Sequence, residues 1–359
     1  MTLTRRGKIA VTAGTVVALS GVGVGALALS GNAPAPIQRA FDEVTGTTHG
    51  EAPPPVCPLT GVAAPHGKIP HRPALAIKVE NAPEARPQTG LNKADIVFEE
   101  PVEGGLTRFI AIFQCGDADR VGPVRSGRTT DPDVLVQLDK PILGYAGAQK
   151  PVREAIDDAG LVDANYIDAA DAYTRDAGRV APHNLYTTTA ALWKAGAKIM
   201  KTHAGPPPAL FTYADELDGR AKKVGEIHLP FSMAYADVYW RWSAKDGRWL
   251  RSHGSEPHVL TDGGQVAATN VVVMQVKVGM SDLVDAAGNH SPTVDLTGKG
   301  KAYVFRNGRM IVGHWERASL RDVTSFVTKS GETIALAPGT TWVELLPTAI
   351  DVETAKKPV

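Results

Sequence analysis

Residues 107–115, with the sequence TRFIAIFQC, are the last of three apolar runs that decide the fold of the first half of this chain. The other two are residues 74–79, ALAIKV, and residues 94–99, ADIVFE. Each run is short, contains β-branched or aromatic residues and is bounded by turn-forming residues, which is the pattern of a half-buried or buried strand. The sequence therefore predicts three strands in this region.

Helical signals follow these strands. Residues 131–140 begin with an Asp-Pro pair, which fits the first turn of a helix. Residues 151–159 have helical spacing and stop at Gly160, and residues 187–200 form a further predicted helix that is capped by a threonine. Because strands alternate with helices, we expect an α/β domain over residues 57–202.

The pattern changes to β after the linker at residues 203–208, HAGPPP. Glycine-containing turns predict two hairpins, since glycine adopts positive φ without strain. The segments that we expect to pair or to be buried as strands are residues 237–243 with 248–253, 301–306 with 309–314, 270–278, and 342–346 as the closing strand. This pattern predicts a mostly antiparallel β-rich domain over residues 209–347, followed by a tail at 348–359.

The N-terminus carries an export signal. A basic stretch at residues 5–8, RRGK, precedes an uncharged apolar run over residues 9–30. Basic residues resist translocation while the apolar run enters lipid, so we expect the rest of the chain to lie outside the cytoplasm. Residues 1–31 fit either a membrane anchor or a cleaved signal peptide that ends near Ala26-Leu27-Ala28. The expected location is therefore extracytoplasmic and membrane-anchored, with secretion as the alternative.

The two cysteines, Cys57 and Cys115, follow the Pro- and Gly-rich residues 32–56, which read as a stalk. An even number of cysteines in an oxidising compartment predicts a disulfide between them. The bond would tie the start of the folded region to the end of the third strand. No cysteine directly follows the apolar run, so we do not expect lipidation there.

Charge and motif content exclude several classes of function. Lys and Arg together number 38, as do Asp and Glu, so the formal net charge is zero. Binding to nucleic acid needs a basic face, and no nucleic-acid partner is expected. The sequence contains no P-loop, nucleophile elbow or dinucleotide fingerprint, and two cysteines cannot build a structural zinc site.

Arginines gather in glycine-rich turns of the first half. Arg108 comes shortly after Glu103 and a pair of glycines, and the segment at residues 122–128, GPVRSGR, contains Arg125 and Arg128. A guanidinium group grips phosphate through two hydrogen bonds, and glycine lets the backbone approach an anion. These residues therefore predict a site for a phosphate-bearing ligand. The alternative is ordinary ion pairing with neighbouring carboxylates.

Three further side chains are candidates for chemistry. Asp95 precedes the apolar part of the second strand, and a carboxylate near phosphate-binding arginines suits Mg²⁺. His183 and Asn184 lie in the segment APHNLY at residues 181–186 and could carry a proton or donate to an anion. The alternative roles are a salt bridge for Asp95 and a loop-fixing hydrogen bond for His183.

The motifs together resemble the YerB-like envelope lipoproteins, a two-part family of unknown function. The stretches that carry the resemblance are residues 86–91, RPQTGL, 94–97, ADIV, 102–109, VEGGLTRF, 122–126, GPVRS, and 181–186, APHNLY. The resemblance covers about residues 58–347 and implies an outward-facing envelope protein, attached to the membrane through its N-terminal segment. The resemblance implies no particular activity. The expectation of a cell-wall or lipid-linked phosphate ligand rests on the arginines instead.

A second pattern is similar to the LytR-CpsA-Psr phosphotransferases, which use Mg²⁺ to attach lipid-pyrophosphate-linked glycopolymers to peptidoglycan. It consists of Asp95, the turn Pro123-Val124-Arg125 and residues 144–148, GYAGA. This resemblance implies that Asp95 helps to hold Mg²⁺ and that Arg125 neutralises phosphate charge. That family has an Arg-Asp pair where this chain has Arg125-Ser126, so a carboxylate is missing. We therefore expect a binding ectodomain, with a Mg²⁺-dependent phosphotransferase as the alternative.

Overall fold

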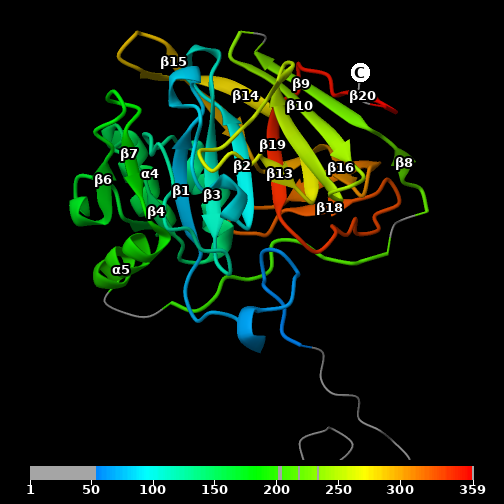
Figure 1. Ribbon diagram of the computed structural model, residues 1–359, viewed down its shortest axis with the longest axis horizontal. Coiled ribbons are helices and arrows are strands. Elements are labelled where there is room, and N and C mark those ends of the chain that lie inside the picture. Colours follow the sequence, from blue (N-terminus) through cyan, green and yellow to red (C-terminus); the bar gives the residue numbers. More distant parts are fainter. Residues whose placement is uncertain (1–53, 201–203, 217–218, 233, 358–359) are drawn as a thin grey trace, which may run out of the picture. The chain divides into compact units, whose positions relative to one another are not determined.

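The computed structural model describes residues 54–200, 204–216, 219–232 and 234–357 (Figure 1). The predicted anchor or signal peptide at residues 1–31 lies outside the described residues, as does almost all of the predicted stalk at 32–56. Among the described residues, no helix has the length and apolarity that crossing a membrane requires.

The three predicted strands of the first half are confirmed, and they form the middle of a twelve-stranded sheet. They are β1 (Leu75–Glu80), β2 (Ile96–Pro101) and β3 (Thr107–Phe113). β3 pairs antiparallel with β1 on one side and with β2 on the other. Nearly every residue of these strands is buried, because both faces of the sheet are covered.

Parallel strands extend this sheet beyond β1. β4 (Ile142–Gly144) pairs in parallel with β1, and β5 (Val162–Asp163) pairs in parallel with β4. The predicted helix before Gly160 is confirmed as α4 (Lys150–Ala159), which connects the two strands, and Gly160 ends it in the left-handed conformation at φ 76°. This part of the first half therefore has the expected α/β character.

The other helices are short. The Asp-Pro pair lies in the first turn of α3 (Thr130–Leu135), which continues as a 3₁₀ turn over Val136–Leu138. α5 (Thr189–Met200) begins after Thr188, whose hydroxyl accepts the Ala191 amide at 3.0 Å, so the predicted threonine cap is confirmed. A two-stranded sheet, β6 (Tyr173–Arg175) and β7 (Leu185–Thr187), lies between them in the chain. The three helices that the sequence predicts in the first half are thus present, although strands outnumber them.

The second half adds antiparallel strands to the same sheet. The hairpin of β16 (Gly298–Arg306) and β17 (Arg309–Arg317) turns at Asn307-Gly308 as predicted, with positive φ at both residues. The other strands of this part are β14 (Asn270–Val284), β15 (His290–Asp295), β18 (Ser325–Val327) and β8 (Lys222–Lys223).

β19 (Thr341–Pro347) joins the two halves. It pairs in parallel with β14 on one edge and with β2 on the other, so it lies in the interior of the sheet. A run that is buried on both faces fits such a central strand better than the closing strand of a separate unit. The division into domains at 57–202 and 209–347 stays a prediction, and both halves contribute to one sheet.

A second, six-stranded sheet packs against one face of the large sheet (Figure 1). Its predicted hairpin is confirmed, with Gly247 at φ 61° in the turn. Trp240 contacts Trp342 of β19 edge to face, and Trp249 contacts Phe305 of β16. The strands are β9 (Glu226–Ser232), β10 (Ala236–Ser243), β11 (Arg248–His253), β12 (Glu256–Pro257), β13 (Ala267–Ala268) and β20 (Glu353–Ala355).

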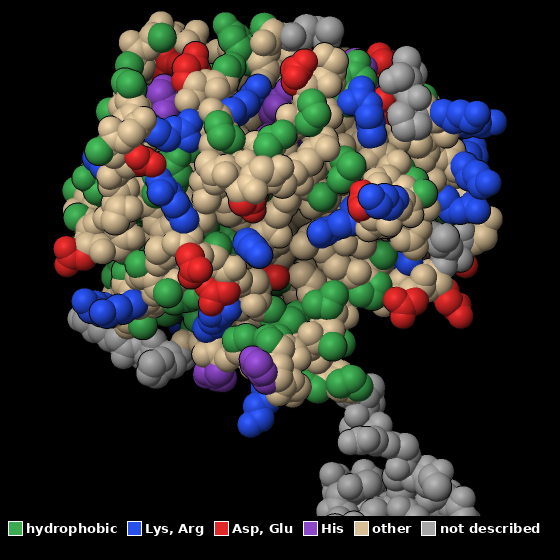
Figure 2. Space-filling view, viewed as in Figure 1, with side chains coloured by type: hydrophobic (Ala, Val, Ile, Leu, Met, Phe, Trp, Pro, Cys, Tyr) green, Lys and Arg blue, Asp and Glu red, His purple; other side chains and the backbone are tan. Residues whose placement is uncertain are grey.

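The surface is mixed in charge. Figure 2 shows Lys and Arg side chains interspersed with Asp and Glu over the visible face, as a chain with zero formal net charge allows. Recognition of a charged ligand must therefore come from a local arrangement of side chains rather than from an extended field.

Candidate functional site

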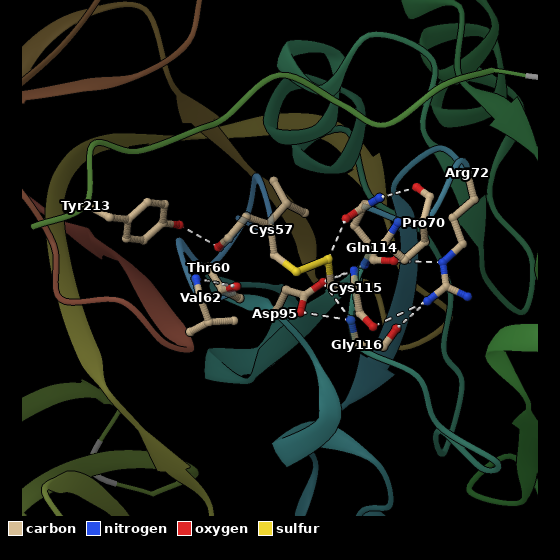
Figure 3. The surroundings of a disulfide bond; sticks show 11 residues. Cys57, Thr60, Val62, Pro70, Arg72, Asp95, Gln114, Cys115, Gly116 and Tyr213 are labelled. Atoms are coloured by element: carbon tan, nitrogen blue, oxygen red, sulfur yellow. Dashed lines mark hydrogen bonds between the residues drawn. A yellow bond between two sulfur atoms is a disulfide. The ribbon is translucent and has the colours of Figure 1, made fainter. Parts of the chain in front are cut away.

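The two cysteines form the predicted disulfide (Figure 3). Cys57 and Cys115 are bonded with their Cα atoms 6.1 Å apart, across a sequence separation of 58 residues. Cys115 lies just after β3, so the bond fastens the first described segment to the end of that strand. The next residues of the chain extend the attachment, since Tyr213 donates its hydroxyl to the Leu59 carbonyl at 2.5 Å.

Asp95 lies beside this disulfide and holds the same turn (Figure 3). Its Oδ2 accepts the amides of Gln114 at 2.5 Å and Cys115 at 2.9 Å, and its Oδ1 accepts the Gly116 amide at 3.0 Å. Burial raises the pKa of Asp95, and the three amide hydrogen bonds oppose that rise. The carboxylate is therefore occupied by backbone donors.

The predicted arginines lie at the opposite end of β2 from Asp95. Arg108 stands at the start of β3 and pairs in register with Glu100 near the end of β2 and with Glu80 at the end of β1. The structure therefore does not bring Asp95 to the arginines. The described residues also contain no group of three or more His, Cys, Asp or Glu that could hold a metal ion. The Mg²⁺ role of Asp95 stays a prediction, and its contacts are structural ones.

Arg108 is a buried cation without an ion pair. It is 8% exposed, and its one hydrogen bond runs from a terminal nitrogen to the Ser126 carbonyl at 3.0 Å. No carboxylate of the described residues makes a salt bridge with it. Burial lowers the pKa of Arg108 to about 10, and the neighbouring charge of Arg128 adds to this effect. The side chain nevertheless stays charged at neutral pH.

Arg125 and Arg128 flank Arg108 and are held by carboxylates. Arg125 donates its Nε to Glu80 Oε1 at 2.9 Å, and Arg128 donates to Glu103 Oε2 from Nε at 2.9 Å and from a terminal nitrogen at 2.6 Å. Their side chains are 27% and 13% exposed. Each of these two residues thus has one carboxylate partner and reaches solvent, while Arg108 is buried.

Backbone pairing with β1 and β4 places these arginines. The Glu80 amide donates to the Pro123 carbonyl and the Arg125 amide donates to the Lys78 carbonyl, both at 2.9 Å. The Gly127 amide donates to the Gly147 carbonyl at 3.0 Å, just beyond the end of β4. The loop therefore lies at the carboxyl ends of the parallel strands β1 and β4, where α/β sheets commonly bind ligands.

Glu80 and Glu103 connect other parts of the chain to this group. Glu80 Oε2 lies 2.9 Å from His183 Nδ1, and the Ser291 hydroxyl of β15 donates to Glu103 Oε1. Burial acts to raise the pKa of Glu103, but the hydrogen bonds from Arg128 and Ser291 and the charge of Arg128 hold it below its usual value. We call Glu80, Glu103, Arg108, Arg125, Arg128 and His183 the arginine cluster.

Asn184 does not face the arginine cluster with its side chain. Its Oδ1 accepts Arg175 at 2.7 Å, and its Nδ2 donates to the Arg179 carbonyl at 3.3 Å. It therefore fixes the loop that carries His183. Of the predicted ligand-binding residues, the structure brings together Glu103, the three arginines and His183, and it places Asn184 in a supporting position.

Sequence reasoning missed a buried ion group beside Arg108. Lys78 on β1 bonds to Glu100 on β2 and to Asp131 of α3, and all three side chains are fully buried. Burial raises the pKa of Glu100 to about 7, against the lowering effect of the Lys78 charge. The only signal in the sequence is a lysine inside an otherwise apolar strand, which also fits an edge position.

A second polar group lies on the other face of the sheet. Six buried side chains form a closed ring of hydrogen bonds, which we call the polar ring. Its successive members are Asn81, Thr107, Glu99, Arg251, His258 and Gln88, and Gln88 donates back to Asn81 at 3.2 Å. Gln88 belongs to the motif RPQTGL and Thr107 to the motif VEGGLTRF. These two motif residues therefore have a structural role in the ring.

Comparisons with known proteins match both halves of the chain. The description "Protein of unknown function (DUF3048) N-terminal domain" matches residues 59–202, and the corresponding C-terminal domain matches residues 227–343. The protein of Bacillus subtilis (strain 168) named "Putative lipoprotein YerB" is 30% identical over 297 residues, which are 81% of this chain and 86% of that protein. The crystal structure of the YerB protein from Bacillus subtilis superposes with a TM-score of 0.71 at 26% identity, covering 83% of this chain and 99% of that one.

Proposed function

The chain belongs to the two-part DUF3048 family of proteins of unknown function, and from this premise we propose that it is an extracytoplasmic envelope protein that binds a phosphate-bearing ligand at the arginine cluster. The name of the Bacillus relative supports the location, because a lipoprotein is attached to a membrane. The basic and apolar residues at 5–30 support the same location in this chain.

The mode of attachment differs from that of a lipoprotein in our proposal. Lipid attachment needs a free cysteine thiol, and Cys57 and Cys115 are consumed in their disulfide. They are the only two cysteines of the chain. We therefore assign the attachment to the apolar run over residues 9–30, which either stays in the membrane or is removed on secretion.

The observation that carries the ligand proposal is the unpaired charge of Arg108. The charges of Glu103 and Glu80 act on Arg108, but both carboxylates are bonded to other arginines and neither forms an ion pair with it. A buried cation without a bonded counter-charge is costly. The charges of Arg125 and Arg128 both act on Arg108, and each of the two arginines is bonded to one carboxylate. An anion that reached Arg108 would supply the ion pair that it lacks. A phosphate group has enough oxygens to accept hydrogen bonds from more than one guanidinium group.

Binding without phosphotransfer is the function that this geometry supports best. The phosphotransferase alternative needs a carboxylate that holds Mg²⁺ near the phosphate, and Asp95 lies at the far end of β2 with its oxygens bonded to backbone amides. The nearby carboxylates Glu80 and Glu103 are bonded to arginines. Turnover of a lipid-pyrophosphate substrate that depends on Mg²⁺ would favour the alternative instead.

The test measures pyrophosphate binding by the purified full-length protein with calorimetry. Replacing Arg125 with Ala should weaken binding about tenfold or more, since a hydrogen bond to a charged group contributes about 1.5–3 kcal/mol. The matched control is Arg153→Ala, which removes an exposed arginine of α4 away from the cluster. A variant that melts at a much lower temperature but binds pyrophosphate as the wild type does would show that Arg125 is structural.

A further inference from the structure

A separate pocket lies near the arginine cluster but is built from different side chains. Its volume is about 360 Å³, and its walls include Arg86, Arg120, Arg179, Asp176, Tyr186 and Thr89. Small-molecule pockets commonly have volumes of about 300–1,000 Å³, so this one suits a small ligand. Arg86 and Thr89 come from the motif RPQTGL and Tyr186 from the motif APHNLY. The function proposed above uses none of these pocket side chains.

Arg179 is held by hydrogen bonds to neutral oxygens, and its charge acts on Asp176 without an ion pair between them. One terminal nitrogen donates to the Pro87 carbonyl at 3.0 Å and to the Tyr186 hydroxyl at 2.6 Å. The other donates to the carbonyls of Glu84 at 3.1 Å and Arg86 at 3.3 Å. These partners are neutral oxygens, so they orient the guanidinium group without cancelling its charge.

Arg86 is in a similar state. One terminal nitrogen donates to the carbonyls of Asn81 at 2.9 Å and Tyr235 at 3.0 Å, and its Nε is buried without a hydrogen-bond partner. Burial lowers the pKa of Arg86 to about 10, and the nearby charge of Arg251 adds to this effect. The charges of Glu99 and Glu84 act on Arg86, but among the described residues no carboxylate forms an ion pair with it.

Arg120 supplies the third charge and Asp176 the single carboxylate. Arg120 makes an ion pair with Asp176 and stacks over the ring of Tyr186, with its central carbon 3.9 Å from the ring centre. Three cations and one carboxylate leave the pocket with a net charge of two positive units. On the same wall, the hydroxyls of Thr89 and Thr261 lie 2.9 Å apart and can bond to a polar ligand.

We propose that this pocket binds the phosphate group of a small, hydroxyl-bearing phosphate ester, such as a sugar phosphate. A phosphate monoester carries almost two negative charges at neutral pH and so matches the net charge of the pocket. Its oxygens accept from the arginines, and the threonine hydroxyls contact the hydroxyl-bearing part. The volume of the pocket exceeds what a phosphate group alone would fill, which is why the ester rather than the free ion is the expected ligand.

The experiment uses the full-length protein with glucose 6-phosphate as the probe and glucose as its neutral counterpart, and binding is followed by calorimetry at low salt. Glucose 6-phosphate should bind and glucose should not. Arg120→Gln should weaken binding about tenfold, because it removes one guanidinium group from a phosphate site. Its side chain is 47% exposed, so we expect this variant to fold. Arg153→Gln is the matched control and should bind as the wild type does.

Asp176→Asn gives a result of the opposite sign. It removes the only carboxylate of the pocket but keeps an acceptor for Arg120, so glucose 6-phosphate should bind more tightly. Arg108→Gln distinguishes this pocket from the arginine cluster. Binding that survives Arg108→Gln but falls with Arg120→Gln supports the proposal. No binding of glucose 6-phosphate, equal binding by wild type and Arg120→Gln, or loss of binding in Arg108→Gln alone would overturn it.

Discussion

Glu99 and Glu344 lie opposite each other in register on the parallel strands β2 and β19, and both are fully buried. Only one guanidinium group serves this pair. Arg251 donates to Glu99 Oε1 at 2.9 Å and to Glu99 Oε2 at 2.7 Å. Glu344 accepts the Trp240 Nε1 proton at 2.8 Å, and its Oε2 accepts no hydrogen bond.

The two carboxyl groups therefore differ in their partners, an arginine for Glu99 and a tryptophan for Glu344. Burial raises the pKa of Glu344 well above its usual value, and the charge of Glu99 raises it further. Glu344 therefore holds its proton more strongly than an ordinary glutamate does, and in the protonated form it can donate that proton to Glu99. The pair lies where β19 joins the two halves of the chain. The polar ring, of which Glu99 is a member, also connects residues of both halves.

The first prediction concerns pH. Because the folded-state pKa of Glu344 lies above the unfolded value, the folded protein binds this proton more strongly than the unfolded one. The contribution to stability is fully present below the unfolded pKa and is lost as pH rises through the folded pKa. The free energy of unfolding in urea should therefore fall as pH rises through the folded-state pKa of Glu344, and Glu344→Gln should remove that part of the fall.

The stability of Glu344→Gln should be compared with that of Arg251→Met. The glutamine keeps an acceptor for Trp240 and carries no charge, so it should cost little stability at pH values below the folded-state pKa of Glu344. Removing Arg251 leaves Glu99 buried without its cation, which commonly costs about 3–5 kcal/mol. If Glu344→Gln leaves the pH dependence unchanged, Glu344 is not the group that carries the proton.

The second prediction concerns the disulfide. Breaking a bond that closes a loop of 58 residues should destabilise the fold by about 4 kcal/mol on the chain-entropy account. The measurement is urea unfolding of the wild type and of a Cys57→Ser, Cys115→Ser double variant, with reduced wild type as the control. Alkylation of both thiols in native, unreduced protein would contradict the bond.

The third prediction concerns topology. An enzyme reporter that is active only outside the cytoplasm should be active when fused after Pro55, because the basic residues at 5–8 stay inside and the apolar run crosses the membrane. A version with the basic residues replaced by acidic ones is the control and should lose activity. Full activity of a cytoplasmic-only reporter at the same position would contradict the proposed location.

The sequence predicted local structure well. The strands around Lys78, Asp95 and Arg108 and the hairpin at Asn307-Gly308 depend on short-range patterns, and they were confirmed with shifts of a few residues. The predicted disulfide was confirmed as well. The glycine-rich turns marked the arginines as a candidate ligand site, and that site stays a proposal.

Long-range pairings could not be predicted from such patterns. The apolar run at β19 gives no sign that its two neighbours are β14 and β2, which lie far away in the sequence. The polar ring was missed for the same reason, because Arg251 and His258 belong to the second half while Glu99 and Gln88 belong to the first. The ligand-binding role of Asn184 stays a prediction, and its bond to Arg175 depends on how its loop folds.

The most direct test of the arginine cluster is a crystal structure of the protein soaked with pyrophosphate. We expect a phosphate group within hydrogen-bond distance of the Arg108 guanidinium and of at least one of Arg125 and Arg128, with Glu80 and Glu103 still bonded to their arginines. An Arg108 that keeps only its bond to Ser126 at saturating pyrophosphate, with no anion at the cluster, would contradict the proposed function.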